Sequence, residues 1–283
     1  MKFSVAAISA IILATVVPLD AADSYSEAMK TWCDGLGVSF PTGETVVVAG
    51  EETKVTVTRK PDERKKTITG LDLFSVDSDG NAKYIQNIWA GSYDLQTTAS
   101  LKDTIPDSVS AGLYYYRVWV TNLIKDPNGD KDTHGPDCLE TSHTFKVTSG
   151  SHTNAAGDIE YTESLHDDSI YHPEHYKGCF GLSVNYPKKG STFNVGHHIH
   201  IQALRDSASQ TDSLIKVELY EGDKFRGVAW TGNEPIQNSF TLKDHLKLEN
   251  INPEADYRYK LYVTSKHSNE ICTFQSKTFN IQG

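Results

Sequence analysis

Two stretches of the chain alternate hydrophobic and polar side chains with a period of two residues. Residues 116–121 have the order Tyr-Arg-Val-Trp-Val-Thr, and residues 259–264 have the order Tyr-Lys-Leu-Tyr-Val-Thr. A period of two in a run of aromatic and β-branched residues predicts a half-buried strand. We therefore expect each stretch to be the central strand of a β-sandwich.

The rest of the chain repeats in the same register, which predicts an internal duplication. Counted from Cys33 and Cys179, the residue types agree at equal offsets as far as 71–74 and 217–220, and they agree again at 89–91 and 230–232 after a shift of five residues. The first half also has an insertion, because Tyr116 to Cys138 spans 22 residues and Tyr259 to Cys272 spans 13. The matched positions are Pro41 with Pro187, Gly50 with Gly196, 71–74 with 217–220, 89–91 with 230–232, 101–103 with 242–244, Cys138 with Cys272, and Phe145 with Phe279.

Each repeated unit has about seven short alternating runs separated by turn residues, and helical periodicity is nowhere sustained. This pattern is typical of sandwiches of the immunoglobulin or fibronectin type. The prediction is an all-β chain with two tandem sandwiches. Residues 22–149 form the first sandwich, 150–177 a polar linker and 178–283 the second sandwich.

Four cysteines allow three pairings, and the repeat selects one of them. It pairs Cys33 with Cys138 and Cys179 with Cys272, so that each bond joins the start of a unit to its last strands. Loops of roughly 100 residues would contribute on the order of 4–5 kcal/mol each in the chain-entropy model. The alternative is free thiols or a four-cysteine metal site, although the chain has no close Cys-x-x-Cys pair.

The first 21 residues have the pattern of a secretory signal peptide. Lys2 precedes an apolar run at 5–17, and Pro18 and small residues follow. The alternative, a membrane anchor, needs a longer apolar run. We expect a secreted protein, extracellular or associated with a cell wall, with no membrane span and no hydrophobic tail for a lipid anchor. Such a compartment supports disulfides.

The overall charge excludes one class of partner. The formal net charge is −10 and the isoelectric point is about 5.5. Binding to nucleic acid phosphates needs a basic surface, so we expect no nucleic acid partner.

Two segments resemble known families. Residues 248–263 resemble the corner between strands E and F of fibronectin type III domains, where a tyrosine hydroxyl pins the corner. Residues 105–118, with Pro41, Gly43 and Gly50, resemble the N-terminal β-sandwich of the fungal Kre9/Knh1-like cell-wall family. The resemblance implies a fungal secreted or wall-associated protein linked to β-glucan assembly, and it brings no catalytic residues. The chain departs from that family because a second sandwich replaces the Ser/Thr-rich or basic C-terminal region.

One loop has the spacing of a calcium ligand set. Oxygen side chains alternate at Asp126, Asn128, Asp130 and Asp132, as in loops that wrap a hard cation. Lys131 occupies the place of the turn glycine of an EF-hand, and no glutamate closes the loop. The alternative is a solvated turn, because these residue types are also common loop formers.

A pair of histidines offers a second candidate metal site. His198 and His200 share one face of a predicted strand, which suits zinc or copper. The alternative is an exposed strand face with no metal. A copper oxygenase that acts on polysaccharide would need a histidine at the mature N-terminus, whereas we expect the mature chain to begin near Ala22.

The outer faces of the two central strands carry the candidate ligand-binding residues. Aromatic rings beside basic groups can stack on sugar rings or pack on another protein. The alternative is that this face is a second core-facing side or is covered by the other domain. The candidates are Tyr115, Arg117 and Trp119 in the first unit and Arg258, Lys260 and Tyr262 in the second.

These features favour a secreted, non-catalytic binding or structural protein of a fungal cell surface or wall. The expected partner is a wall polysaccharide or a surface protein. No cofactor is required, and calcium is a candidate ligand of the loop described above. We assign no catalytic residue, because the chain has no Gly-x-Ser-x-Gly elbow. The alternatives are a factor or enzyme that assists β-glucan wall assembly and a secreted protein that binds calcium, zinc or copper.

Overall fold

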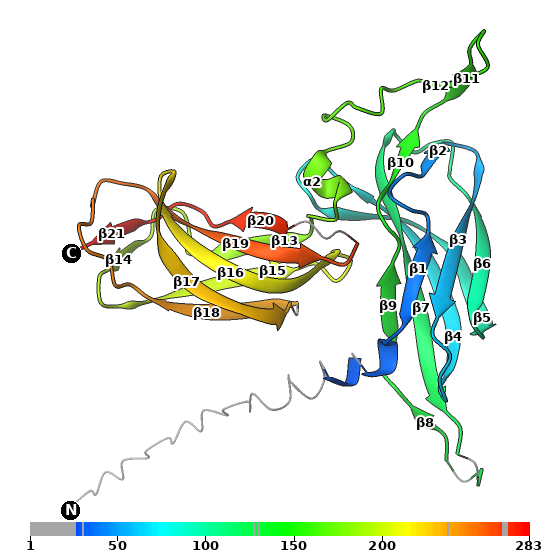
Figure 1. The fold of residues 1–283 in the computed structure, drawn as a ribbon, viewed down its shortest axis with the longest axis horizontal. Coiled ribbons are helices and arrows are strands. Elements are labelled where there is room, and N and C mark those ends of the chain that lie inside the picture. Colours follow the sequence, from blue (N-terminus) through cyan, green and yellow to red (C-terminus); the bar gives the residue numbers. More distant parts are fainter. Residues whose placement is uncertain (1–26, 30, 127, 130, 237, 268–270) are drawn as a thin grey trace, which may run out of the picture.

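The computed structural model describes residues 27–283, except 30, 127, 130, 237 and 268–270. Residues 1–21, the predicted signal peptide, lie outside the described residues. The described chain is almost entirely β, and it forms two sandwiches whose strands run in crossing directions rather than in line (Figure 1). The predicted fold class is therefore confirmed.

The first sandwich pairs a three-stranded sheet with a larger one. The order of the small sheet is β1-β3-β6, and the order of the large one is β2-β10-β7-β4-β5, with β8 and β9 also paired to β7. The strands are β1 (Leu36–Phe40), β2 (Val46–Val48), β3 (Glu52–Arg59), β4 (Lys65–Val76), β5 (Ala82–Leu95), β6 (Thr98–Thr104), β7 (Gly112–Ile124), β8 (Thr133–His134), β9 (Cys138–Thr141) and β10 (Phe145–Thr148).

The second sandwich repeats this topology. Its sheets have the orders β13-β15-β18 and β17-β16-β19-β20, and a parallel pair β14-β21 matches the parallel pair β2-β10. The strands are β13 (Leu182–Tyr186), β14 (Thr192–Asn194), β15 (His198–Arg205), β16 (Thr211–Glu221), β17 (Lys224–Pro235), β18 (Ser239–His245), β19 (Tyr257–Ser265), β20 (Ile271–Gln275) and β21 (Asn280–Gln282).

The two cores are organised around equivalent tyrosines in the central strands β7 and β19. Tyr116 is fully buried and donates a hydrogen bond to Asp103 Oδ2 at 2.6 Å, and Tyr259 donates to Asp244 Oδ2 at 2.7 Å. Both rings stack on the phenylalanine that the repeat matched, with centroids 5.4 Å apart in the first domain and 5.3 Å in the second. A buried hydroxyl needs such a partner, so the duplication preserves a satisfied polar pair within each core.

Both predicted disulfides are present. Cys33 bonds to Cys138 and Cys179 bonds to Cys272. Each bond ties the segment that enters a sandwich to a strand at the edge of its larger sheet, β9 or β20. None of the cysteines is free, so the alternative of a four-cysteine metal site is wrong.

The tyrosine corner expected from residues 248–263 also forms. The Tyr257 hydroxyl donates to the carbonyl of Asn252 and accepts from its backbone N–H, at 3.3 and 3.1 Å. In the first domain the Tyr114 hydroxyl donates to the Ser110 carbonyl at 2.8 Å. Each bond fixes the chain before the central strand.

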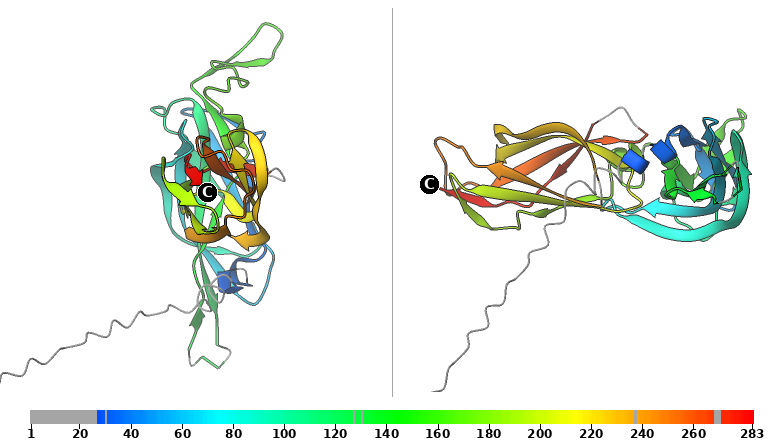
Figure 2. Two further views of the ribbon diagram at one scale, coloured as in Figure 1. Left: turned by 90° about the vertical axis from the view of Figure 1, so that its left-hand side faces the viewer. Right: turned by 90° about the horizontal axis from the view of Figure 1, so that it is seen from below.

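Residues 150–177, predicted as a polar linker, contain ordered structure. β11 (Ser151–Thr153) and β12 (Ile159–Tyr161) pair as a hairpin that projects away from both sandwiches (Figures 1 and 2). The short helix α2 (Pro173–Tyr176) follows. Tyr171 anchors the segment, since its buried hydroxyl donates to the Val147 carbonyl at 3.0 Å.

One end of the second sandwich abuts the large sheet of the first. The contact uses the loop at 178–181 and the loop at 206–210, which joins β15 to β16. Gly181 N–H donates to the Gly80 carbonyl at 2.8 Å, and both residues have positive φ, 74° and 78°, which glycine adopts without strain. The Gln210 side chain bonds to the Ser142 carbonyl and the Thr144 hydroxyl of the first domain.

Candidate functional site

The candidate site is the outer face of the sheet β17-β16-β19-β20 in the second domain. In β16 and β19 one set of alternating residues, including Val217 and Tyr259, is buried in the core. The other set therefore points away from the core. The strand register places Glu218 opposite Lys260 and Tyr220 opposite Arg258.

A carboxylate lies at the centre of this face. Glu218 accepts hydrogen bonds from the Tyr262 hydroxyl at 2.6 Å and the Tyr220 hydroxyl at 2.8 Å, and Lys216 Nζ lies 2.8 Å from its other oxygen. Burial by itself would raise the pKa of Glu218, but the three donors outweigh it and lower the pKa to about 2. The group is therefore an ionised acceptor at all ordinary pH values.

Rings and ammonium groups surround the carboxylate. Lys216 Nζ lies 4.2 Å from the centre of the Tyr262 ring, and Lys260 Nζ lies 5.2 Å from it. The Tyr220 ring meets the Phe225 ring edge to face at 5.9 Å. Phe225 is 51% exposed. We call these residues the open face, and its members are Lys216, Glu218, Tyr220, Phe225, Lys260 and Tyr262.

The first domain has an equivalent cluster around Asp72 on β4. Trp119 Nε1 donates to Asp72 Oδ2 at 2.7 Å, and Arg117 pairs with the same oxygen at 3.3 Å. The Arg117 guanidinium lies over the Phe74 ring at 4.5 Å and the Trp119 ring at 5.0 Å. Asn87 donates to the other Asp72 oxygen at 2.9 Å.

The prediction that Tyr115 belongs to an exposed binding platform is wrong. Its side chain is fully buried. The ring stacks on Phe74 at 5.4 Å and contacts Phe180 of the second domain at 5.3 Å. Its hydroxyl donates to the Ala208 carbonyl at 2.8 Å. The stated alternative therefore holds here, because the second domain covers this part of the face.

The structure brings together two of the three candidates in the second domain. Lys260 and Tyr262 both belong to the open face, whereas Arg258 pairs with the exposed Asp223 at 2.6 Å. The central carboxylates, Asp72 and Glu218, were not among the residues predicted from the sequence. The signal was present, because the matched segments 71–74 and 217–220 place an acid at the same offset beside an aromatic residue.

The predicted calcium loop connects β7 to β8, and Asp130 lies outside the described residues. In the described part, carboxylate oxygens accept backbone N–H groups: Asp126 from Asn128 at 2.8 Å, and Asp132 from Asp126 at 3.3 Å. These bonds are those of a turn. Calcium binding by Asp126, Asn128, Asp130 and Asp132 stays a prediction.

The predicted histidine site lies on the other sheet of the second domain. His198 and His200 are exposed on β15, and the His198 ring lies 4.6 Å from the ring of His245 on β18. Within the described ranges, no group of three or more His, Cys, Asp or Glu side chains is placed to hold a metal ion. Zinc or copper binding stays a prediction that would need a ligand from elsewhere.

The comparisons with known proteins identify no family. No family model matches the chain. A curated protein from Aspergillus tamarii, "AA9 family lytic polysaccharide monooxygenase B", is 32% identical over 91 residues, which are 32% of this chain and 24% of that protein. The chain thus spans about a quarter of the length of this relative.

Solved structures match over most of the chain at low similarity. The fibronectin(III)-like modules of Clostridium thermocellum CbhA are 10% identical, with a TM-score of 0.21 over 87% of this chain and 94% of theirs. The structure of Rst D1-D2 is 8% identical, with a TM-score of 0.25 over 88% of this chain and all of that one. No described helix is long and apolar enough to cross a membrane.

Proposed function

We propose that this protein is an extracellular, non-catalytic binding protein whose open face holds a polysaccharide. The observation that carries the proposal is the arrangement on the second domain. An exposed phenylalanine and two tyrosines lie on one sheet face around an ionised carboxylate. Sugars offer both an apolar ring face and hydroxyl groups, and this surface can meet both.

The rings supply the apolar contact. Phe225 and Tyr220 lie edge to face, so the exposed ring stands beside a second aromatic surface. An aromatic ring provides large contact area and loses little side-chain freedom on binding. Because the residues lie on neighbouring strands of one sheet face, the surface suits an extended chain more than a small enclosed ligand.

The polar groups supply orientation. Lys216 and Lys260 present ammonium donors beside Tyr262, and the buried Glu218 accepts from Lys216, Tyr220 and Tyr262 and so fixes these donors in place. A carboxylate with a pKa of about 2 is a poor base near neutral pH, because general bases work best with pKa values near the working pH. Glu218 is therefore suited to holding hydroxyl groups and not to proton transfer, which favours binding over catalysis.

The experiment is a pull-down of the secreted protein on insoluble β-glucan, chitin and mannan, with an assay for released sugar. We expect retention on one of them without release. Phe225→Ala and Tyr262→Ala should each weaken retention at least tenfold, which corresponds to about 1.4 kcal/mol. Tyr93→Ala is the matched control, because Tyr93 is also an exposed ring but lies on the first domain.

Three results would contradict the proposal. Absence of retention on all three polymers would favour a surface protein as the partner. Retention that Phe225→Ala and Tyr262→Ala leave unchanged would move the site elsewhere. Sugar release that depends on the protein would instead favour the wall-assembly role implied by the Kre9/Knh1-like resemblance. Parallel samples with calcium or a chelator test the loop at Asp126.

A further inference from the structure

The free end of the first sandwich carries a concentration of positive charge in an acidic protein. Residues 59–66, which end β3 and begin β4, read Arg-Lys-Pro-Asp-Glu-Arg-Lys-Lys. All of them except Lys60 line a surface cavity of about 310 Å³, together with Leu95, Gln96 and Lys125. The proposed polysaccharide face lies on the other domain, so this cavity is a separate feature.

Three of the cations are largely removed from solvent, and two of them share one carboxylate. The side chains of Arg59 and Arg64 are 5% and 17% exposed, and Lys66 is 1% exposed. Asp62 pairs with Arg59 at 2.7 Å through one oxygen and with Arg64 at 2.6 Å through the other. Among the described residues, Asp62 is thus the carboxylate that pairs directly with this cluster of three cations.

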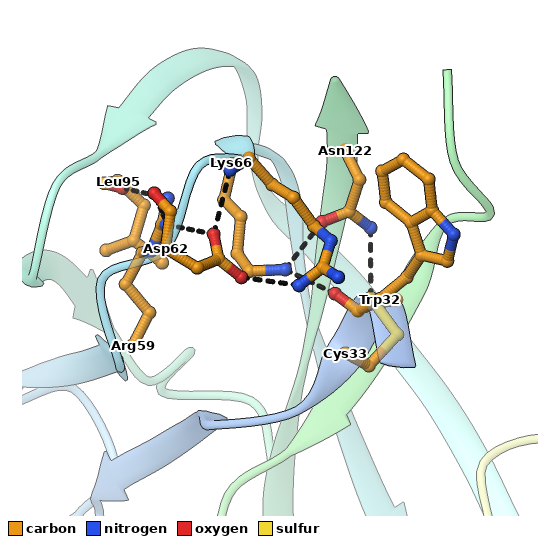
Figure 3. Close-up of polar contacts among 9 residues, drawn as sticks. Trp32, Cys33, Arg59, Asp62, Lys66, Leu95 and Asn122 are labelled. Carbon is orange, nitrogen blue, oxygen red and sulfur yellow. Dashed lines mark hydrogen bonds and ion pairs between the residues drawn. A yellow bond between two sulfur atoms is a disulfide. The ribbon is translucent and has the colours of Figure 1, made fainter. Parts of the chain in front are cut away.

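Lys66 has neutral partners. Its ammonium group donates to the Trp32 carbonyl and, at 2.7 Å, to the amide oxygen of Asn122 (Figure 3). Burial lowers the pKa of Lys66; the charge of Asp62 opposes this shift, the charges of Arg59 and Arg64 add to it, and Asp34 opposes it least. A buried ammonium with no directly paired carboxylate is costly, and a bound anion would relieve that cost.

The guanidinium groups also retain unused donors. Nε of Arg59 and Nε of Arg64 are buried, and neither has an acceptor among the described residues. Arg59 is fixed in place, because its other nitrogens donate to the Leu95 carbonyl and to Asp62. Buried donors without acceptors are rare in folded proteins and call for an explanation.

The second domain shows that the fold does not require these charges. At the matched positions, Arg205 replaces Arg59, but Ala208 replaces Asp62, Gln210 replaces Arg64 and Asp212 replaces Lys66. Arg205 Nε is satisfied there, since it donates to the Thr211 carbonyl at 3.0 Å. The excess charge is thus a specific property of the first domain.

We propose that the cavity between β3 and β4 of the first domain binds a single oxyanion group, a carboxylate, sulfate or phosphate, through Arg64, Lys66 and Lys125. Planar guanidinium groups hold such anions with paired hydrogen bonds. The net charge of −10 repels polyanions at long range. The site therefore suits one acidic group, such as the carboxylate of a uronic acid or a free inorganic anion.

The test is calorimetry and thermal unfolding of the secreted protein with sodium sulfate, sodium phosphate or galacturonate, against sodium chloride at equal ionic strength. We expect saturable heat and a rise in melting temperature with at least one of the three, as for any ligand that binds only the folded state. Arg64→Gln should weaken binding at least tenfold. A response to sulfate or phosphate alone would identify an inorganic anion, and a stronger response to galacturonate an acidic sugar.

The control is Lys188→Gln, which removes one positive charge from an exposed position of the second domain. Sulfate also stabilises proteins by exclusion from their surface, so only the difference between wild type and Arg64→Gln counts. Lys125→Gln is a second test variant, because its exposed side chain can change without loss of the fold. No saturable heat with any of the three anions, or equal binding by wild type, Arg64→Gln and Lys125→Gln, would overturn the proposal.

Discussion

The two domains have the same topology but use equivalent surfaces in opposite ways. In the first domain, Phe74 and Tyr115 on the outer sheet face are covered by Phe180 of the second domain. In the second domain the matched face, with Tyr220 and Phe225, faces outward. The matched ends of the two sandwiches are used in the opposite way. In the second domain, the end with the loops at 178–181 and 206–210 is buried at the junction. In the first domain, the matched end with residues 59–66 lies outside the junction.

This difference shows how a duplicated chain gains surfaces for partners. The outer sheet face of the first domain and one end of the second domain contact each other and hold the domains together. The other copy of each has no such task, and it carries the more unusual chemistry: Glu218 with its two tyrosines on the open face, and Lys66 with its excess charge at the free end. The internal contact thus indicates which two surfaces are available for ligands.

The largest effect that we predict tests how alike the two domains are. Replacing either disulfide by an alanine pair should lower the free energy of unfolding of its domain by about 4–5 kcal/mol in the chain-entropy model. The loops span 105 and 93 residues, so the two losses should agree within a few tenths of a kcal/mol. Scanning calorimetry of Cys33→Ala/Cys138→Ala and Cys179→Ala/Cys272→Ala measures both.

An additional loss in the first domain would show that the domains differ near this bond. Asn122 donates to Cys138 Sγ at 3.1 Å and also holds Lys66, so the disulfide helps to position the cationic cluster. Equal losses of unfolding free energy in the two domains would show that the disulfide does not help to position the cationic cluster. A loss below about 1 kcal/mol in either domain would contradict the entropic account.

The second prediction concerns the covered face. Tyr115→Ala should cost about 3 kcal/mol, because it removes a fully buried aromatic ring between the domains. Arg258→Ala, at the matched position of the second domain, removes only a surface ion pair and should cost less than about 1 kcal/mol. Urea unfolding gives the energies, and small-angle scattering reports whether the domains separate.

Tyr115→Phe is the matched control. It keeps the stacking on Phe74 and Phe180 and loses only the bond to the Ala208 carbonyl, for a cost of about 1 kcal/mol. If Tyr115→Ala leaves both the scattering profile and the stability unchanged, the two domains are not held together by this contact.

The core could be predicted from the sequence, but the use of the surfaces could not. Pairs such as Asp103 with Tyr116 and Asp244 with Tyr259 recur in both halves because each core must be packed and satisfied within its own domain. The burial of Tyr115 depends on where the second domain lies, and alternation along a strand shows only that its side chain points away from the first core. The cluster around Lys66 lacks a counterpart in the second half, so the repeat gave no guide to it.

The third prediction is that acid weakens the junction between the domains. His267 of the second domain lies near His143 of the first, with ring centres 5.8 Å apart. Burial lowers the pKa of His267 to about 4, and the positive charges of His143 and Lys266 contribute. Its pKa in the folded state is below the unfolded value of about 6.5, so its contribution is fully present above pH 6.5 and is lost as the pH falls toward 4.

Stability measured from pH 7 to pH 4 should fall by on the order of 2 kcal/mol through this group. Glu140, also at the junction, has a pKa raised by burial and acts in the opposite sense, since its protonation favours the folded state. The difference between wild type and His267→Gln isolates the histidine. The same slope in both proteins would exclude His267 as the titrating group.

The smallest effect distinguishes the two central carboxylates. Tyr262→Phe removes a donor at 2.6 Å from Glu218 and should cost about 1 kcal/mol. The pKa of Glu218 should then rise from about 2 toward its ordinary value, and carbon NMR of the carboxylate measures it.

Because the folded pKa lies below the unfolded one, Glu218 stabilises the fold above about pH 4.5 and loses this effect as the pH falls toward 2. Tyr262→Phe should therefore make the second domain less stable near neutral pH and less sensitive to acid, while the first domain, whose Asp72 keeps Trp119 and Asn87, stays unchanged. An unaltered pKa of Glu218 would mean that Lys216 and Tyr220 alone hold the charge, and that the hydroxyl of Tyr262 is free to bind sugar.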